Sequence, residues 1–593
     1  MNLRTPAHFV LPLATLLAAG SAFAQPPQET AIRATANRGI ALIQKSTANW
    51  TAGCFSCHHQ ALTMMALGAA RQHGLAVDEK AAQAASNRDL ALAASVDDAL
   101  RDGILIDPSS QEGYLLVAAR AAGIEPNLSL ALYARRIANH QRDDGHWTTF
   151  DNRPPQGESR ITATAIAARG VSLYMPPQLA TTRQATLSRA HQWLRSAKSE
   201  STEDLTFRIL GLHWTAPDGK IPADLGKALA AEALKRQRPD GGWSQVAARS
   251  SDCYATGQIL YALAETGLVA PSDPAYQRGL AYLIKTQSGD GAWHVTSRMK
   301  TKVNVSPPYM ETGYPYGHDQ FVSISGATWA IMALAAALPA KPAAPLPVTA
   351  ATVRGELPWM STVLFGSTAD LDRALKTGLD PNAASAGGTT VLMMAAHDPE
   401  KVKLLLARGA KATARAKSGY DALMIASLFR RNTAAMTLLL DAKAEVNPTK
   451  TVFNATPLTL AAFTGDAEPV ELLLKRGAKV GNRMMLLGMV PANAFDIACS
   501  FESPSTIKLL AANGAQVDEV DPQGLTQLSL AALAHKNESV RALLEAGANP
   551  NHVDKLGLTP LQHTAGIEHL SPETAELLKQ RGAGKSAASG SRR

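Results

Sequence analysis

The stretch QRPDGGW at residues 237–243 is one of three copies of the pattern Gln-x-x-Asp-Gly-x-Trp. The other copies span residues 141–147 and 287–293, which puts the three tryptophans 96 and then 50 residues apart. A degenerate copy at residues 189–194 would divide the longer interval into two units of about 48 residues. Asp-Gly favours a turn, and the apolar periodicity on either side favours helices. The repeat therefore predicts a series of helical hairpins joined by Gly-containing turns.

These motifs resemble the QW repeats of squalene–hopene cyclases and of the related prenyltransferase toroids. For residues 25–335 the resemblance implies an all-α fold, an α/α toroid of about six helical hairpins. It also implies an interior able to bind an apolar small molecule. The Asp-x-Asp-Asp acid motif of the hopene cyclases is absent, and Asp252-Cys253 matches the prenyltransferase zinc site only with a spacing off by one. We therefore expect a protein that is not a cyclase, with an enzyme acting on an isoprenoid-like substrate as an alternative.

A second repeat follows a Pro- and Ala-rich stretch at residues 336–357, which we interpret as a linker. From Gly378 to Gly582, helix ends related to Leu-Leu-x-x-Gly-Ala recur at intervals of 31 to 37 residues. Thr456-Pro457 and Thr559-Pro560 supply a Thr cap followed by Pro in the first helical turn.

These features closely resemble ankyrin repeats, about seven over residues 358–583. The resemblance implies a stacked solenoid whose concave face binds a protein partner. The alternative is that the repeats pack against the toroid as a brace. Residues 584–593 are small and polar, and we expect a disordered tail there.

The first 24 residues have the features of a secretory signal peptide. One charge, Arg4, precedes an apolar run, and Ala22-Phe23-Ala24 offers a small-x-small cleavage site. We expect cleavage after Ala24 and a periplasmic or secreted protein. The remaining chain has no apolar run of transmembrane length. The net charge of +8 is spread without a long basic run, so a nucleic-acid partner is not expected.

Residues 54–58 contain three side chains that can bind a cofactor or a metal. Cys54, Cys57 and His58 form Cys-x-x-Cys-His, the attachment signature of c-type haem. Two thiols on one helical turn reach the two vinyl groups of a haem, and the adjacent His58 ligates the iron. We therefore expect one covalently attached haem c. Alternatives are a disulfide between the two cysteines, a zinc site or a thioredoxin-like redox pair.

A second axial ligand should come from another segment of the chain. If the toroid closes, its last unit lies beside its first, and the last unit contains a long irregular stretch at residues 294–320. His318 and Met310 are the candidate distal ligands in that stretch.

Taken together, the sequence predicts an exported, haem c-binding protein that acts in electron transfer or in redox or ligand sensing through a protein partner. The alternatives are the toroid enzyme and an interaction scaffold of the cell envelope without haem.

Overall fold

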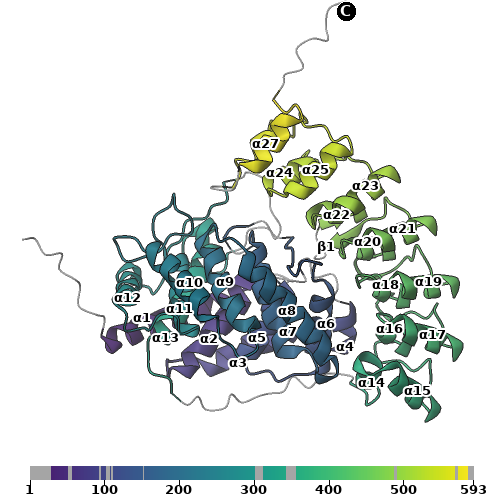
Figure 1. Ribbon diagram of the computed structural model, residues 1–593, viewed down its shortest axis with the longest axis horizontal. Helices are drawn as coiled ribbons and strands as arrows, with labels where there is room; N and C mark the ends of the chain where they lie inside the picture. Colours follow the sequence, from purple (N-terminus) through teal and green to yellow (C-terminus); the bar gives the residue numbers. More distant parts are fainter. Residues whose placement is uncertain are drawn as a thin grey trace, which may run out of the picture.

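The computed structural model describes most of the chain, and the described residues are predominantly helical, as expected. The expected signal peptide, most of the linker, Cys54 and Met310 lie outside the described residues. The described residues are 28–50, 57–91, 95–101, 107, 111–150, 153–155, 157–300, 311–341, 356–486, 490–567 and 572–584. Figure 1 shows two bodies side by side: a ring of helices from the N-terminal half and a stacked array from the C-terminal half.

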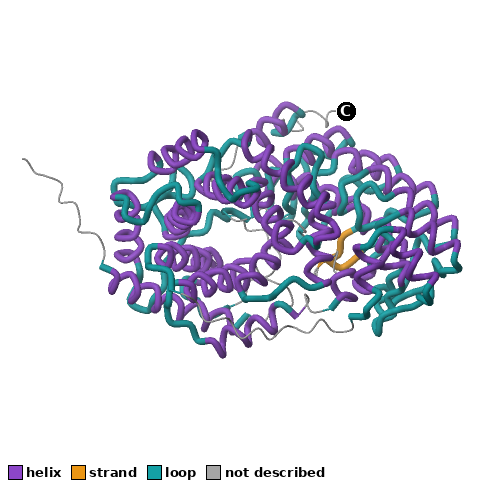
Figure 2. Tube along the Cα trace, turned by 60° about the horizontal axis from the view of Figure 1, so that its bottom comes forward, coloured by secondary structure: helices purple, strands orange, loops and turns teal. Residues whose placement is uncertain are grey.

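Six inner helices form the ring, and each contacts the next: α2 with α5, then α7, α9, α11 and α13, which returns to α2. Figure 2 shows this ring beside the array. The inner helices are α2 (Leu62–Gln72), α5 (Gln111–Ala121), α7 (Arg160–Tyr174), α9 (Thr202–Thr215), α11 (Cys253–Glu265) and α13 (Gln320–Ala336). Several of them are buried on nearly every side, because other helices surround them. At Gly257 the backbones of α11 and α13 are so close that a Cβ would lie 2.5 Å from the Trp329 carbonyl carbon.

Further helices pack outside the ring; most of them bury a single stripe, whereas the helix at Leu128–Asn139 is buried on nearly every side. On α12 that stripe is Tyr276, Leu280 and Leu283, at helical spacing. The outer helices are α1 (Glu29–Ala48), α3 (Glu79–Asp89), α4 (Val96–Arg101), α6 (Leu128–Asn139), α8 (Ala180–Ser196), α10 (Ala223–Lys235) and α12 (Pro274–Thr286). Short turns of other helix types are η1 (Cys57–Ala61), η3 (Pro177–Leu179), η4 (Gly317–Asp319) and η5 (Val452–Asn454).

The three Gln-x-x-Asp-Gly-x-Trp turns have the same geometry. In the second copy the Gln237 amide donates to the carbonyls of Gly241 and Ala275, and the Trp243 indole donates to a carbonyl of α10. Arg278 of the next outer helix donates to the Gln237 side chain at 2.7 Å. In the first copy Arg189, which lies in the expected degenerate unit, donates to the Gln141 side chain in the same way. In the third copy Arg38 of α1 donates to the Gln287 side chain. The third turn therefore joins the end of the ring to its beginning.

The described residues of the array form seven helix pairs, in which inner helices contact inner helices and outer helices contact outer helices along the stack. The inner helices are α14 (Met360–Phe365), α16 (Val391–Ala395), α18 (Ala422–Ala426), α20 (Pro457–Ala462), α22 (Ala494–Ser500), α24 (Gln527–Leu533) and α26 (Pro560–His563). The outer helices are α15 (Thr368–Lys376), α17 (Pro399–Ala407), α19 (Thr433–Asp441), α21 (Ala467–Lys475), α23 (Pro504–Ala512), α25 (Asn537–Glu545) and α27 (Glu573–Gln580).

The expected Thr-Pro starts are present in the array. Thr456 and Thr559 each accept a backbone N–H of the first turn, and the following Pro opens the helix. One departure from an all-helical chain is an antiparallel strand pair, β1 (Met484–Leu486) with β2 (Val490–Ala492). None of the described helices combines the length and apolar character needed to cross a membrane.

Candidate functional site

The inner helices of the array face the ring (Figure 1). The ring contacts the turns that join inner to outer helices in successive repeats, and Asp97 of α4 also accepts hydrogen bonds from Ser385 and Gly387, in the loop that precedes α16. His397 and Arg430 meet α6, Phe501 and Glu502 meet Arg142 and Arg160, and Lys536 meets the Thr149 carbonyl. In the last repeat the Lys300 backbone N–H donates to the Gly566 carbonyl at 2.8 Å. Since the Leu364 carbonyl of the first repeat also accepts from Arg135 of the ring, the ring lies along the array from its first described repeat to its last.

Buried polar groups of α6 form the centre of this contact. Arg135 donates to the Leu364 carbonyl at 2.6 Å and to His397 Nε2 at 2.9 Å. His140 hydrogen bonds through Nε2 to the Leu428 carbonyl at 2.9 Å, and burial lowers the pKa of His140 to about 4. The imidazole is therefore neutral at pH 7 and donates this hydrogen bond.

This contact changes which face of the array is available to a partner. The sequence predicted that the concave face binds another protein, with bracing of the toroid as the alternative. The inner helices Val391–Ala395 and Ala422–Ala426 are buried throughout, and Phe501 stacks on Phe150 of the ring at 5.8 Å. The turns at the ends of the inner helices therefore carry contact with the chain's own ring, as in the bracing alternative, and this part of the array is occupied.

The loops that precede the inner helices form another face of the array, which we call the loop edge. Five of the six large apolar residues that are exposed in the described structure lie on it, although α-helical periodicity would not have located them. They are Phe453, Val490, Val520, Val553 and Leu556, with exposed fractions between 37% and 57%. Four successive repeats each contribute at least one of them. Phe453 also has a φ of +59°, a conformation that bulky side chains rarely adopt.

The predicted haem segment leads into the first inner helix. Cys57 and His58 open η1, directly before α2, but their side chains and all of Cys54 lie outside the described residues. The neighbouring His59 is buried, stacks on Trp50 at 4.9 Å, and hydrogen bonds through Nε2 to Thr312 Oγ1 at 3.0 Å.

The candidate distal segment thus lies beside the motif segment. Thr312 also accepts from Ser46 of α1 at 3.1 Å and donates to Gln320 of α13 at 2.6 Å, so it joins the first and last units of the ring. Met310, two residues earlier, is outside the described residues, and His318 is exposed in η4. The structure therefore places the two segments side by side, and the axial ligands remain a prediction.

A cavity of about 540 Å³ lies at the end of the ring that is formed by the C-terminal parts of all six inner helices. Met65, Trp214 and Met332 contribute apolar surface, and the Arg169 guanidinium lies 5.4 Å from the Trp214 ring centroid. A cavity of this size falls within the range of small-molecule sites.

One buried acid inside the ring was missed by the sequence analysis. Glu203, in the first turn of α9, is 2% exposed and accepts hydrogen bonds from Thr162, Tyr254 and Gln258. Burial raises the pKa of Glu203 to about 8. Asp252, which the sequence analysis had compared with a zinc ligand, instead caps α11 by accepting the Ala255 N–H at 2.8 Å.

Comparison with known proteins assigns the C-terminal half. The sequence profile of the family "Ankyrin repeats" matches residues 359–450, 392–484 and 495–588. The ankyrin repeat protein YahD of Escherichia coli is 30% identical over 197 residues, which are 31% of this chain and 92% of YahD. The chain belongs to the ankyrin-repeat proteins. The ankyrin resemblance seen in the sequence is thereby confirmed, whereas these relatives say nothing about the ring.

Other ankyrin-repeat proteins match over smaller shares of their length. "Ankyrin repeat protein nuc-2" of Neurospora crassa is 29% identical over 210 residues, 35% of this chain and 19% of that protein. "SH3 and multiple ankyrin repeat domains protein 2" of Homo sapiens is 43% identical over 77 residues, 13% of this chain and 4% of that protein. The crystal structure of the human ASB11 ankyrin repeat domain is 22% identical with a TM-score of 0.33, covering 38% of this chain and 98% of that domain.

Proposed function

We propose that this ankyrin-repeat protein is an interaction scaffold whose loop edge binds a protein partner while its ring braces the inner-helix face. The single observation that carries the proposal is the series of exposed apolar side chains in four successive repeats. Exposed apolar residues that gather on one surface are typical of binding sites for proteins.

Charge around the loop edge supports the same function. Exposed Lys450 and Lys555 lie next to the apolar residues, as do Asp518 and Glu519. An apolar centre with a charged rim is the usual anatomy of a protein–protein interface. The partner we propose therefore offers apolar side chains bordered by charges of both signs.

Substitution on the loop edge tests the scaffold. A photocrosslinker at residue 556 first captures the partner. The double variant Val520→Ser with Val553→Ser should then bind this partner at least about tenfold more weakly. Lys403→Ser on the outer helix α17 is the control and should bind like the unchanged protein. Unchanged affinity in the double variant, or no crosslinked protein above background, would contradict the proposal.

We also propose that Cys54, Cys57 and His58 hold one covalent haem c, in an exported protein. The donor set fits the group, since two thiols and an imidazole stand in the required spacing. The hydrogen bond between His59 and Thr312 supports a site between the first and last units of the ring. When bound, such a haem supplies one-electron transfer or binding of a diatomic ligand.

The haem proposal has its own test. Protein made with its first 24 residues and with the haem-ligation machinery should give a c-type pyridine haemochrome spectrum and a haem-stained band. Cys54→Ser with Cys57→Ser should lose both signals and keep its helical circular dichroism. A colourless unchanged protein, made under the same conditions, would leave the scaffold as the function.

We also propose that residues 25–335 are related to the QW-repeat toroids. The shared turn geometry and the hydrogen bond that Arg38 donates to Gln287 support this relationship. We infer that the cavity at the C-terminal parts of the inner helices takes an apolar small molecule. Native mass spectrometry should detect such a molecule, and Trp214→Ala should reduce its occupancy.

A further inference from the structure

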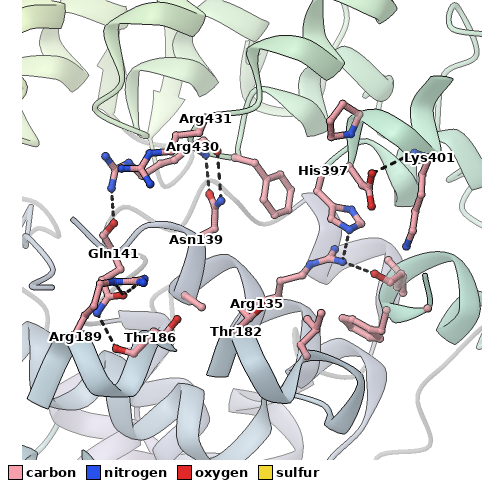
Figure 3. Close-up of a pocket in the computed structure, with 18 residues that line it drawn as sticks. Arg135, Asn139, Gln141, Thr182, Thr186, Arg189, His397, Lys401, Arg430 and Arg431 are labelled. Atoms are coloured by element: carbon pink, nitrogen blue, oxygen red, sulfur yellow. Dashed lines mark hydrogen bonds between the residues drawn. The ribbon is translucent and has the colours of Figure 1, made fainter. Parts of the chain in front are cut away.

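A cavity of about 470 Å³ lies between the ring and the array (Figure 3). One wall comes from α6 and α8 of the ring, and the other comes from the first three repeats of the array. Among its lining side chains are five cations and a single acid, Asp398. The cations are Arg135, Arg189, Lys401, Arg430 and Arg431.

Two of these cations form ion pairs with acids that do not line the cavity. Arg430 pairs with Asp466 at 3.0 Å, and Arg431 pairs with Asp143. Arg135, Arg189 and Lys401 differ, since no carboxylate in the described part of the chain lies within 4.0 Å of them.

The two deepest cations are compensated only in part. Arg135 is 7% exposed and Lys401 is 2% exposed. They donate to the carbonyls of Leu364 and Val363 at the C-terminal end of α14, which carry partial charge only. The Nε and Nη2 atoms of Arg135 make no hydrogen bond within the described structure.

The remaining neighbours offset this charge only in part, since His397 is neutral and Asp398 is the one acid among the lining residues. His397 accepts from Arg135 through Nε2 and contacts the Met394 carbonyl through Nδ1, which fixes it as a neutral ring. The carboxylate of Asp398 already accepts two backbone N–H groups as the cap of α17. Burial lowers the pKa of Lys401 to about 8 and that of Arg135 to about 9, although the charge of Asp398 opposes both shifts, so the two cations are only partly compensated.

The shape of the cavity suits an anion with an organic part. Arg189 is exposed at its opening, whereas Arg135 and Lys401 lie deep. Phe365, Phe429 and Leu179 add apolar walls, and the volume exceeds that of a bare inorganic ion. Arg is well suited to bind phosphate oxygens because its donors form a planar fork.

We propose that this cavity binds a small organic phosphate, whose anionic group offsets Arg135 and Lys401 and so joins the ring to the array. The proposal goes beyond the scaffold function, because it concerns a different surface and a different class of ligand. A molecule bound there contacts both bodies and stabilises their present arrangement by mass action.

Calorimetric titration of the full chain with phenyl phosphate tests the site. Inorganic phosphate should bind more weakly than phenyl phosphate, since it leaves the apolar walls uncovered, and phenol should not bind. Absence of saturable phenyl phosphate binding up to about 10 mM would overturn the proposal. So would equal binding of benzoate, which would assign the cavity to carboxylates, or equal heat from sodium chloride at the same ionic strength.

Variants locate the binding. Lys401→Met and Arg135→Met should each weaken phenyl phosphate binding by about tenfold or more, and Arg189→Gln at the exposed opening should weaken it by about threefold. Arg431→Gln, on the rim and paired with Asp143, is the matched control and should stay within about twofold. Arg189 is exposed but also donates to Gln141 in the first repeated turn, so its variant is informative if its melting temperature equals that of the unchanged protein. Unchanged affinity in both Lys401→Met and Arg189→Gln would contradict the site.

Discussion

At the residue scale, Glu203 makes the stability of the ring depend on pH. Its pKa is raised from 4.5 to about 8, so the folded chain keeps a proton that the unfolded chain releases above pH 4.5. This contribution to the free energy of unfolding is therefore complete below about pH 4.5 and is lost as the pH rises through about 8. Glu203→Gln carries no such proton. We expect the free energy of unfolding of this variant to fall less steeply between pH 5 and 8 than that of the unchanged protein. The two slopes should differ by at most about 1.4 kcal/mol per pH unit.

Urea unfolding followed by circular dichroism at several pH values measures this difference. Glu200→Gln, an exposed acid only three residues earlier, is the control and should follow the unchanged protein. If Glu203→Gln gave a profile parallel to the unchanged protein, the acid would be ionised when folded and its burial would be compensated in another way.

At the element scale, the repeated turn depends on a glycine with a left-handed backbone. Gly241 has a φ of +88°, and a Cβ there would lie 2.7 Å from the Arg278 carbonyl oxygen of the next outer helix. Gly241→Ala should therefore destabilise the ring by about 2 kcal/mol or more, from backbone strain together with the clash. Gly289→Ala is the control, because a Cβ at that position meets nothing within 4 Å. Thermal unfolding distinguishes them, and equal melting temperatures would remove the turn from the determinants of the fold.

The same elements show what could be predicted from sequence. The turn and the Thr-Pro caps were recognisable because their hydrogen bonds join residues a few positions apart, or residues at one repeat's distance. The contact between Arg135 and His397 joins residues 262 positions apart and has no local pattern. The same is true of Glu203, whose chemistry comes from neighbouring helices, and of exposed Phe453, which depends on how the repeats stack. The haem ligands remain a prediction from spacing alone.

At the scale of the whole molecule, the ring and the array cover each other. Phe429 and Phe501 are 7% and 3% exposed, and Phe501 stacks on Phe150 of the ring. Arg135 of the ring lies 5.6 Å from the Phe429 ring centroid. An array without the ring would expose these aromatic side chains to water, which costs about 25 cal/mol for each Å² of apolar surface.

We therefore expect residues 356–593 alone to self-associate and to raise the fluorescence of an apolar dye several-fold above that of the full chain. Phe429→Ser with Phe501→Ser in the isolated array should reduce both effects, because it removes the surface responsible. Gel filtration and dye titration measure the two. An isolated array that stayed monomeric, with dye binding at the level of the full chain, would mean that the repeats bury these aromatics themselves. The ring would then be an attached module, and the inner-helix face would again be open to a partner.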